Sequence, residues 1–203
     1  MQHSIKQIEQ IAKKHYPSLP YHNFQHALQI RRNALKFVRR CKKYKIPVNR
    51  EVVEIAALFH DAGYDKVKTN KEEYSSKIAE KELKKLKYPT KFINQVRNSI
   101  MATKSSWPLR ARATEQKILR AADLLSFNSS YDNFLKAAKR IQNEYKILYN
   151  KDNFPFRKWT ELVESYLKEE IKLTPQYKKD DFHRKARKNI TRFLKENLKL
   201  RDK

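Results

Sequence analysis

The chain has 203 residues and a formal net charge of +25, because 47 lysines and arginines stand against 22 aspartates and glutamates. Its one glycine, Gly63, excludes the glycine-rich loops with which Rossmann, Walker A and kinase folds cradle phosphates. Its one cysteine, Cys41, excludes an internal disulfide and a zinc site built from several thiolates.

The pattern of apolar residues predicts an all-α fold. Apolar positions recur with the three- and four-residue spacing of amphipathic helices, and seven prolines separate such segments. The expected helices span 2–15, 24–44, 50–62, 71–87, 90–103, 114–127, 130–149, 156–172 and 175–199. Asn23, Asn49, Thr90 and Thr114 are placed as N-caps, because short polar side chains accept hydrogen bonds from the first turn. Segment 104–113 has a proline and no clear period, which predicts an irregular connection.

The sequence shows none of the segments that direct a chain to a membrane. No stretch holds the roughly 18 uninterrupted apolar residues of a membrane span, and the N-terminus lacks the apolar part of a secretion signal. No linker and no internal repeat divides the chain. We therefore expect a soluble, cytoplasmic protein with a single domain.

Positive charge is concentrated in parts of the sequence. Glu9 is the only acid in residues 1–50, and along the helix expected at 24–44 cations share one face while apolar residues share another. The cationic face holds Arg32, Lys36, Arg39, Arg40 and Lys43, and the apolar face holds Ala27, Ile30, Ala34, Val38 and Cys41. Such a field attracts polyanions, nucleic acid among them. The alternative is a compositional bias, since 32 of the basic residues are lysines and 15 are arginines.

Three short stretches hold side chains that can bind a metal ion. His22 and His26 stand four residues apart at the start of a helix, so both rings can lean to the same side. His60 and Asp61 end an otherwise apolar helix, and Asp123 interrupts another. A carboxylate on an apolar helix face is costly to ionise without a cation or several donors. One shared metal ion would satisfy His60, Asp61 and Asp123 together, and structural ion pairs are the alternative.

The order of these residues resembles the HD-domain superfamily of metal-dependent phosphohydrolases, in which a His, an adjacent His-Asp pair and a distant Asp lie on a helical bundle. Here the pattern is His26, His60-Asp61 and Asp123. The stretch Tyr-His-Asn-x-x-His at 21–26 is similar to cyclic-nucleotide phosphodiesterases and to small bacterial HD hydrolases. The resemblance covers roughly residues 20–127, which implies an HD core there, with C-terminal helices at about 128–200 packing on it.

The resemblance also implies a metal site. His26, His60, Asp61 and Asp123 would hold a divalent ion, with Asp61 as the central ligand of the catalytic centre. Two imidazoles and two carboxylates suit Mn²⁺, Fe²⁺, Mg²⁺, Co²⁺, Ni²⁺ and Zn²⁺ alike. An ion with four protein ligands keeps positions for a water and a phosphate oxygen. The expected reaction is hydrolysis of a phosphoester or a phosphoanhydride.

Other residues near these motifs are candidates for catalysis and substrate binding. His22 matches the general acid of the phosphodiesterases, and a local bond at the helix start is the alternative. Glu72 and Glu73 are candidates to orient the water or a ligand histidine, with exposed first-turn acids as the alternative. Three cations of the irregular segment are candidates to contact the substrate phosphate, with a solvated basic loop as the alternative: Lys104, Arg110 and Arg112.

Two functions from different classes follow from these observations. The first is a metal-dependent phosphohydrolase that acts on a nucleotide or a related phosphorylated small molecule. The second is a basic helical nucleic-acid-binding protein with a structural or vestigial metal site, which the charge of +25 supports. Metal content and turnover of phosphorylated substrates distinguish the two.

Overall fold

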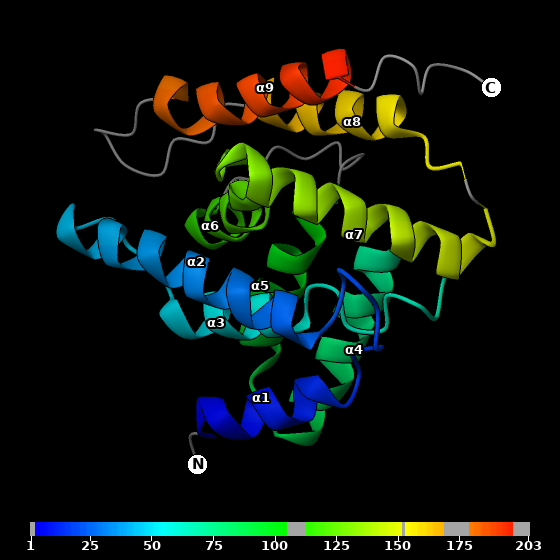
Figure 1. The fold of residues 1–203 in the computed structure, drawn as a ribbon. Helices are drawn as coiled ribbons and strands as arrows, with labels where there is room; N and C mark the ends of the chain where they lie inside the picture. The colour runs from blue at the N-terminus through cyan, green and yellow to red at the C-terminus, as the bar shows by residue number, and fades with distance from the viewer. Residues whose placement is uncertain (1–2, 105–112, 152, 169–178, 197–203) are drawn as a thin grey trace.

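The computed structural model describes residues 3–104, 113–151, 153–168 and 179–196, and this part of the chain contains helices and no strand (Figure 1). The helices are α1 (Ile5–Lys13), α2 (Phe24–Lys43), α3 (Arg50–Phe59), α4 (Lys71–Lys85), α5 (Thr90–Met101), α6 (Thr114–Asp123), α7 (Tyr131–Tyr149), α8 (Phe156–Lys168) and α9 (Lys179–Glu196). A 3₁₀ turn, η1 (Leu124–Asn128), follows α6 directly. The expected all-α, single-domain fold is confirmed. None of these helices is long and apolar enough to pass through a bilayer.

Two of the expected N-caps are confirmed. Oδ1 of Asn23 accepts a hydrogen bond from the amide of His26 at 3.1 Å, and Oδ1 of Asn49 accepts one from the amide of Val52 at 3.3 Å. Each bond satisfies an amide of the first helical turn that has no partner within the helix. The cap at Asn23 therefore also fixes the start of α2, where His26 lies.

The N-cap prediction is wrong by one residue at two other helices. Thr90 and Thr114 are the first helical residues, and the extended residues before them, Pro89 and Ala113, are the N-caps. The ring of Pro89 fixes its φ at a value that the extended N-cap conformation accepts. At α6, Oε1 of Gln116 accepts from the amide of Ala113 at 3.4 Å, so a side chain within the helix takes over the capping.

Helix α3 forms the centre of the larger apolar core. Every residue from Val52 to Phe59 is buried, and α1, α2, α4, α5 and α6 contact this helix. The two expected faces of α2 are confirmed. Ala27, Ile30, Ala34, Val38 and Cys41 are buried, whereas Arg32, Lys36, Arg39, Arg40 and Lys43 are exposed. The larger core thus spans α1 to α6 and supports the ends of α3 and α6.

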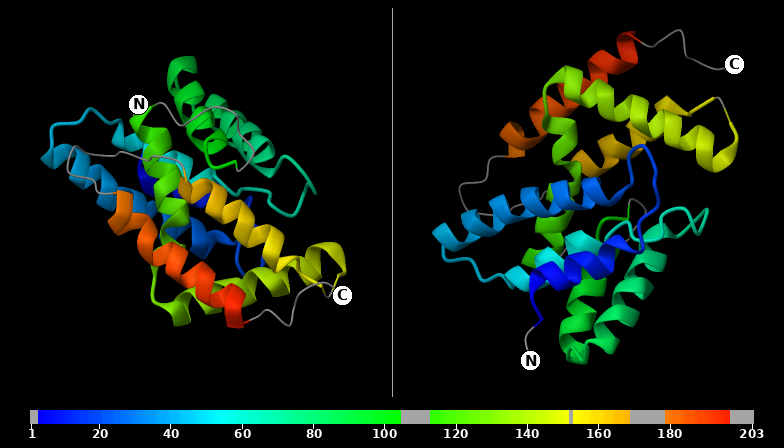
Figure 2. Two further views of the ribbon diagram at one scale, coloured as in Figure 1. Left: turned by 90° about the horizontal axis from the view of Figure 1, so that it is seen from above. Right: turned by 60° about the horizontal axis from the view of Figure 1, so that its bottom comes forward.

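A second, smaller core joins η1 to the last three helices. Its buried members are Leu124, Phe127, Phe134, Ala138, Val163, Ala186, Ile190 and Phe193. Trp159 is a packing residue, because its ring centroid lies 5.5 Å from that of Phe127 and 6.2 Å from that of Phe134. Helices α8 and α9 lie side by side above α7 in the view of Figure 1, and Figure 2 shows the same pair from above.

Gly63 has a backbone conformation that other residues rarely adopt. Its φ is +71°, and a Cβ there would come within 2.6 Å of Tyr74 Cε1 and 2.8 Å of Ile78 Cδ1. Its amide donates to the carbonyl of His15 at 2.8 Å, which ties the loop after α3 to the end of α1. We expect Gly63→Ala to lower the free energy of unfolding by about 1–3 kcal/mol, measured by urea denaturation.

Lys87→Gly is the matched control for this substitution. Lys87 is exposed and has a φ of +58°, so glycine relieves backbone strain there without removing a contact in the core. We expect the free energy of unfolding of Lys87→Gly to stay level or rise. A Gly63→Ala variant as stable as the parent would show that the loop after α3 adapts to the added methyl group.

Candidate metal centre

Three separate elements bring the four expected metal ligands together. His26 lies in the first turn of α2, His60 and Asp61 directly follow α3, and Asp123 is the last residue of α6. The ends of α3 and α6 meet because both helices pack in the larger core. His26 and Asp123 therefore face each other, although they are 97 positions apart in the sequence.

The distances between ligand atoms of His26, His60 and Asp123 suit a single metal ion, and Asp61 lies beside both imidazoles. Nε2 of His26 lies 3.6 Å from Oδ2 of Asp61 and 3.7 Å from Oδ1 of Asp123. Nε2 of His60 lies 2.8 Å and 3.9 Å from the same two oxygens. One ligand atom each from His26, His60 and Asp123 lie within 4.8 Å of one another. Two atoms bound to one ion at about 2.1 Å are about 3 Å or more apart, so these spacings fit.

The two imidazoles each present a nitrogen that has no hydrogen-bond partner. Nε2 of His26 and Nε2 of His60 are buried, and neither makes a hydrogen bond within the described residues. Nδ1 of His60 donates to the carbonyl of Ala57 at 3.0 Å, so Nε2 is the nitrogen with which His60 would bind a cation. A buried polar nitrogen without a partner is costly, and coordination of a metal ion removes that cost. The donor set therefore fits a divalent cation.

The charges of this group also favour a cation. Burial opposes the charged form of His60, but the Asp61 and Asp123 carboxylates outweigh it and raise the pKa of His60 to about 9. Burial likewise opposes ionisation of Asp61, yet the facing imidazoles, His60 foremost, hold its pKa well below the usual range. Burial lowers the pKa of His26. Asp61 is thus ionised and His26 neutral, as metal ligands must be, whereas His60 carries a proton that a bound cation would replace.

His22 is held beside this group by a glutamate from α7. Its Nδ1–H donates to Oε1 of Glu144, and the backbone amides of His22 and Tyr21 donate to Oε2 of Glu144 at 2.8 Å and 3.1 Å. The Glu144 side chain is only 3 % exposed. Burial opposes its ionisation, but these hydrogen bonds hold the pKa of Glu144 below its ordinary value. The ring of His22 lies 5.7 Å from the ring of His26, measured between centroids.

Tyr64 and Lys71 complete the surroundings of His22. The rings of His22 and Tyr64 are stacked, with centroids 3.7 Å apart and planes inclined by 13°. Nζ of Lys71 lies 3.4 Å from the centroid of the Tyr64 ring. Burial lowers the pKa of Lys71, against the pull of nearby carboxylates. A cation, a phenol ring and an imidazole are therefore layered next to the metal group.

The structure separates the two glutamates that the sequence could not distinguish. Burial raises the pKa of Glu72, and the negative charge of Asp61 adds to this effect. Glu73 makes an ion pair with Lys77 at 2.7 Å on the surface of α4, and the structure does not bring it to the metal group. Adjacent residues of a helix point about 100° apart, which accounts for the difference.

Of the three expected phosphate contacts, one lies in the described part of the chain. Nζ of Lys104 donates to Oδ1 of Asn70 at 2.8 Å, and its charge acts on Glu72. Lys104 thus lies near the start of α4. Arg110 and Arg112 fall outside the described residues.

Sequence reasoning missed three residues that the structure places at the site. Tyr64 belongs to the stretch after the His-Asp pair, and Lys71 precedes Glu72, so proximity to these motifs could have drawn attention to both. Glu144 is 122 residues from His22, and no local signal relates them. A buried acid on the face of α7 is evident only once the helices are assembled.

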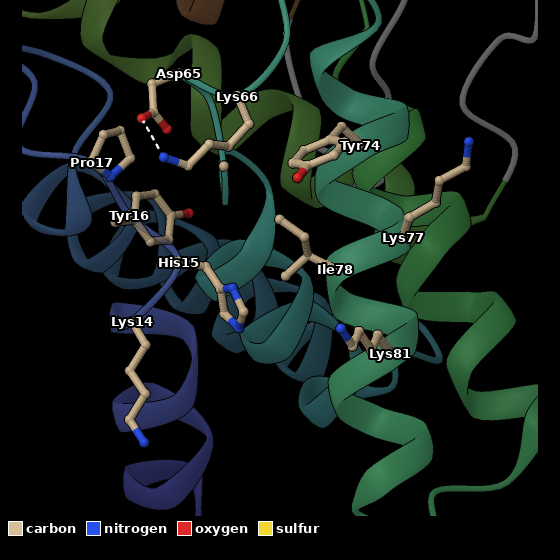
Figure 3. Close-up of a pocket in the computed structure, with 11 residues that line it drawn as sticks. Lys14, His15, Tyr16, Pro17, Asp65, Lys66, Tyr74, Lys77, Ile78 and Lys81 are labelled. Atoms are coloured by element: carbon tan, nitrogen blue, oxygen red, sulfur yellow. Dashed lines mark hydrogen bonds and ion pairs between the residues drawn. The ribbon is translucent and has the colours of Figure 1, made fainter.

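A cavity of about 400 Å³ lies between the residues that follow α1, the loop that follows α3, and α4 (Figure 3). Tyr16, Gly63 and Tyr74 line it, together with Asp65 and Lys66, whose charged atoms are 2.9 Å apart. None of the four expected metal ligands lines this cavity. Tyr16 links this cavity to the metal group, because its hydroxyl accepts a hydrogen bond from the amide of Asp61 at 3.3 Å. The cavity is therefore adjacent to the metal group but separate from it.

Comparison with known families gives one match. The family model described as HD domain matches residues 23–128, just over half of the 203 residues. No curated protein matches the chain. The matched part contains the four expected metal ligands, whereas His22 precedes it and Glu144 follows it.

Proposed function

The chain belongs to the HD-domain family, and on that basis we propose that it is a metal-dependent phosphohydrolase acting on a nucleotide or a related phosphorylated small molecule. The bond cleaved is a phosphoester or a phosphoanhydride. The observation that carries this proposal is the convergence of two buried imidazole nitrogens without hydrogen-bond partners on the carboxylates of Asp61, next to His60, and of Asp123, at the end of α6. A purely structural ion pair needs no second unpartnered imidazole.

His26, His60, Asp61 and Asp123 are the proposed ligands of one divalent cation. When bound, such a cation acidifies a water molecule and neutralises charge on the phosphoryl oxygens. Asp61 lies between both imidazoles and supplies negative charge at the centre of the group. The hydrogen bond from His60 to Ala57 keeps the His60 ring in one orientation, which pre-organises the group for its ion.

His22 is the proposed donor of a proton to the leaving oxygen. Its Nδ1 is committed to Glu144, so Nε2 is the atom that holds and delivers the proton. Glu144 accepts three hydrogen bonds from residues 21 and 22, which hold the ring of His22 in one orientation. Glu144 is thus a positioning residue for His22.

The cations near the group are proposed to hold the oxygens of the phosphate that do not react. Lys71 lies over the ring of Tyr64, and Lys104 is bound to Asn70 at the start of α4. Arg110 and Arg112 follow Lys104 in the sequence and are assigned the same role. Of the two glutamates we assign only Glu72 to the water, because Glu73 is engaged with Lys77.

A nucleic-acid-binding protein with a vestigial metal site is the less favoured function. A vestigial site tends to lose ligands or fill with side chains that satisfy each other, whereas here both imidazoles keep an unpartnered Nε2. The positive charge remains compatible with phosphorylated substrates of any size.

The proposal is tested on purified protein by elemental analysis of bound metal, followed by hydrolysis assays. The assays use bis-p-nitrophenyl phosphate, p-nitrophenyl phosphate and a panel of nucleotides, each with Mn²⁺, Mg²⁺, Co²⁺ or Ni²⁺ added. We expect stoichiometric metal, turnover of at least one phosphorylated compound, and loss of turnover with a chelator. Protein that is folded by circular dichroism, binds no divalent ion and hydrolyses nothing in the panel would refute the proposal.

A further inference from the structure

A polar groove begins at His26 and runs along α2 opposite α7. Its volume is about 650 Å³, which is within the range of sites that hold small-molecule ligands. The 3₁₀ turn η1 contributes Ser126 and Ser129 to its lining, and α2 and α7 form the facing walls. In Figure 1, α7 lies above the N-terminal part of α2. The groove therefore shares a metal-group residue but extends away from the group.

Glu144 fixes which face of α7 is turned toward α2. Asn133, Lys136, Ala137 and Arg140 line the groove and precede Glu144 at spacings of three and four residues, so all five lie on one face of α7. Glu144 accepts hydrogen bonds from residues 21 and 22, directly before α2. The groove-lining face of α7 is thus held toward α2 by the same contacts that orient His22.

The lining has a one-sided charge. Among the described residues that line the groove none is acidic, whereas Arg32, Lys136 and Arg140 are cations with exposed side chains. Three cations without a counter-ion in a groove create a site for an anion with several oxygens. Since the groove lies beyond His26, this anion is a different group from one held at the metal ligands.

The α2 wall carries amide side chains arranged in a network. Arg32 Nη2 donates to Gln29 Oε1 at 2.8 Å, and Gln29 Nε2 donates to Asn33 Oδ1 at 3.1 Å. Asn33 is only 6 % exposed, so the network is anchored in the protein. Both polar groups of Asn23 are engaged, with Leu19 and His26, whereas Asn128 adds an amide whose buried Oδ1 has no hydrogen-bond partner among the described residues. Amide side chains present a donor and an acceptor together, as the edge of a nucleobase requires.

We propose that this groove binds the nucleoside of the substrate together with a second phosphate that lies beyond the one being cleaved. The inference rests on the proposed function and names its substrate class: a nucleotide with two separately placed phosphate groups. The amides face the base, and Arg32, Lys136 and Arg140 hold the distal phosphate. The α7 wall lies outside the residues that the HD-domain model matches, whereas the α2 wall lies within them.

The test is equilibrium binding by isothermal titration calorimetry, with metal-free protein at low salt. The probes are adenosine 3′,5′-bisphosphate and adenosine. Lys136→Glu and Arg140→Glu reverse two groove cations on exposed positions, where the fold tolerates the change. Lys139→Glu is the matched control, because Lys139 is an exposed cation of the same helix that does not line the groove. This test requires neither bound metal nor turnover. A negative result here would therefore not count against the proposed phosphohydrolase activity.

We expect Lys136→Glu and Arg140→Glu each to weaken binding of adenosine 3′,5′-bisphosphate by about tenfold or more, and Lys139→Glu to change it by about twofold or less. Binding of adenosine should be the same in all variants. Equal weakening by all three substitutions would reduce the effect to general attraction by net charge and overturn the proposal. So would unchanged binding of the bisphosphate in both groove variants.

A short single-stranded RNA distinguishes a free nucleotide from the end of a nucleic acid strand as the source of the distal phosphate. Lys36 is exposed on α2 one turn beyond Arg32 and does not line the groove. If a free nucleotide is the ligand, a tetraribonucleotide binds no more tightly than the bisphosphate, and Lys36→Glu affects neither. Tighter binding of the tetranucleotide that Lys36→Glu removes supports the same groove chemistry with a strand end as the source.

Discussion

Replacing Asp61 by alanine is expected to remove both the bound metal and the phosphohydrolase activity while the helices stay intact. Oδ2 of Asp61 lies 2.8 Å from His60 Nε2 and 3.6 Å from His26 Nε2, so its loss removes the negative charge from the centre of the ligand set. A metal ion contributes several kcal/mol to stabilising the transition state, so turnover should fall by about 10³-fold or more. Elemental analysis, a hydrolysis assay and circular dichroism measure the three quantities.

Asp65→Ala is the matched control for this variant. Asp65 lies in the same loop, is exposed, and makes an ion pair with Lys66 at 2.9 Å. Its substitution removes the same charge four residues further along and should leave metal content and turnover unchanged. Stoichiometric metal in Asp61→Ala would show that the ligand assignment is wrong. Metal loss in both variants would instead trace the effect to the loop as a whole.

For His22→Ala we expect a fall in kcat of about 10²–10⁴-fold with unchanged metal content, since a general acid contributes about that much. Metal content is preserved because the Nδ1 of His22 is bound to Glu144 rather than to the ligand set. Substrates with a p-nitrophenolate leaving group need no proton and should lose much less. Equal losses for phenolate and alkoxide leaving groups would identify His22 as a structural residue or a substrate contact.

Glu144→Gln tests whether Glu144 acts through His22. The amide keeps the size of the side chain but replaces one of the two acceptor oxygens that hold His22, so kcat for alkoxide leaving groups should fall by less than in His22→Ala. In the double variant, adding Glu144→Gln to His22→Ala should lower kcat little further, because the imidazole that Glu144 positions is already absent. Additive losses in this cycle would show that Glu144 acts independently of His22.

Much of the fold was accessible from the sequence because helical periodicity is a local property. The apolar face of α2 and the buried run of α3 follow directly from residue spacing. The N-caps were less certain, since a proline and a side chain inside the helix took the capping roles expected of Thr90 and Thr114. The division of the chain at about residue 127 stays a prediction.

The candidate site was predictable only where its residues lie in compact motifs. His26, the His60-Asp61 pair and Asp123 stand in a recognisable order, and the structure brings them together. Glu144 was out of reach, because its contact with His22 depends on how α7 packs after 122 intervening residues. The groove opposite α7 was equally hidden, since Arg32 and Arg140 meet the same space from helices distant in sequence.

The division of the apolar residues into two cores affects how the protein unfolds at low denaturant concentration. The ligand set is attached to the larger core, whereas Glu144 belongs to α7, whose buried residues Phe134 and Ala138 lie in the smaller one. Small cores open as separate cooperative units at lower denaturant than large ones, which native-state hydrogen exchange detects. Partial unfolding of the smaller unit would release His22 and leave the ligands in place. We expect the partly unfolded protein to keep its bound metal but to lose turnover.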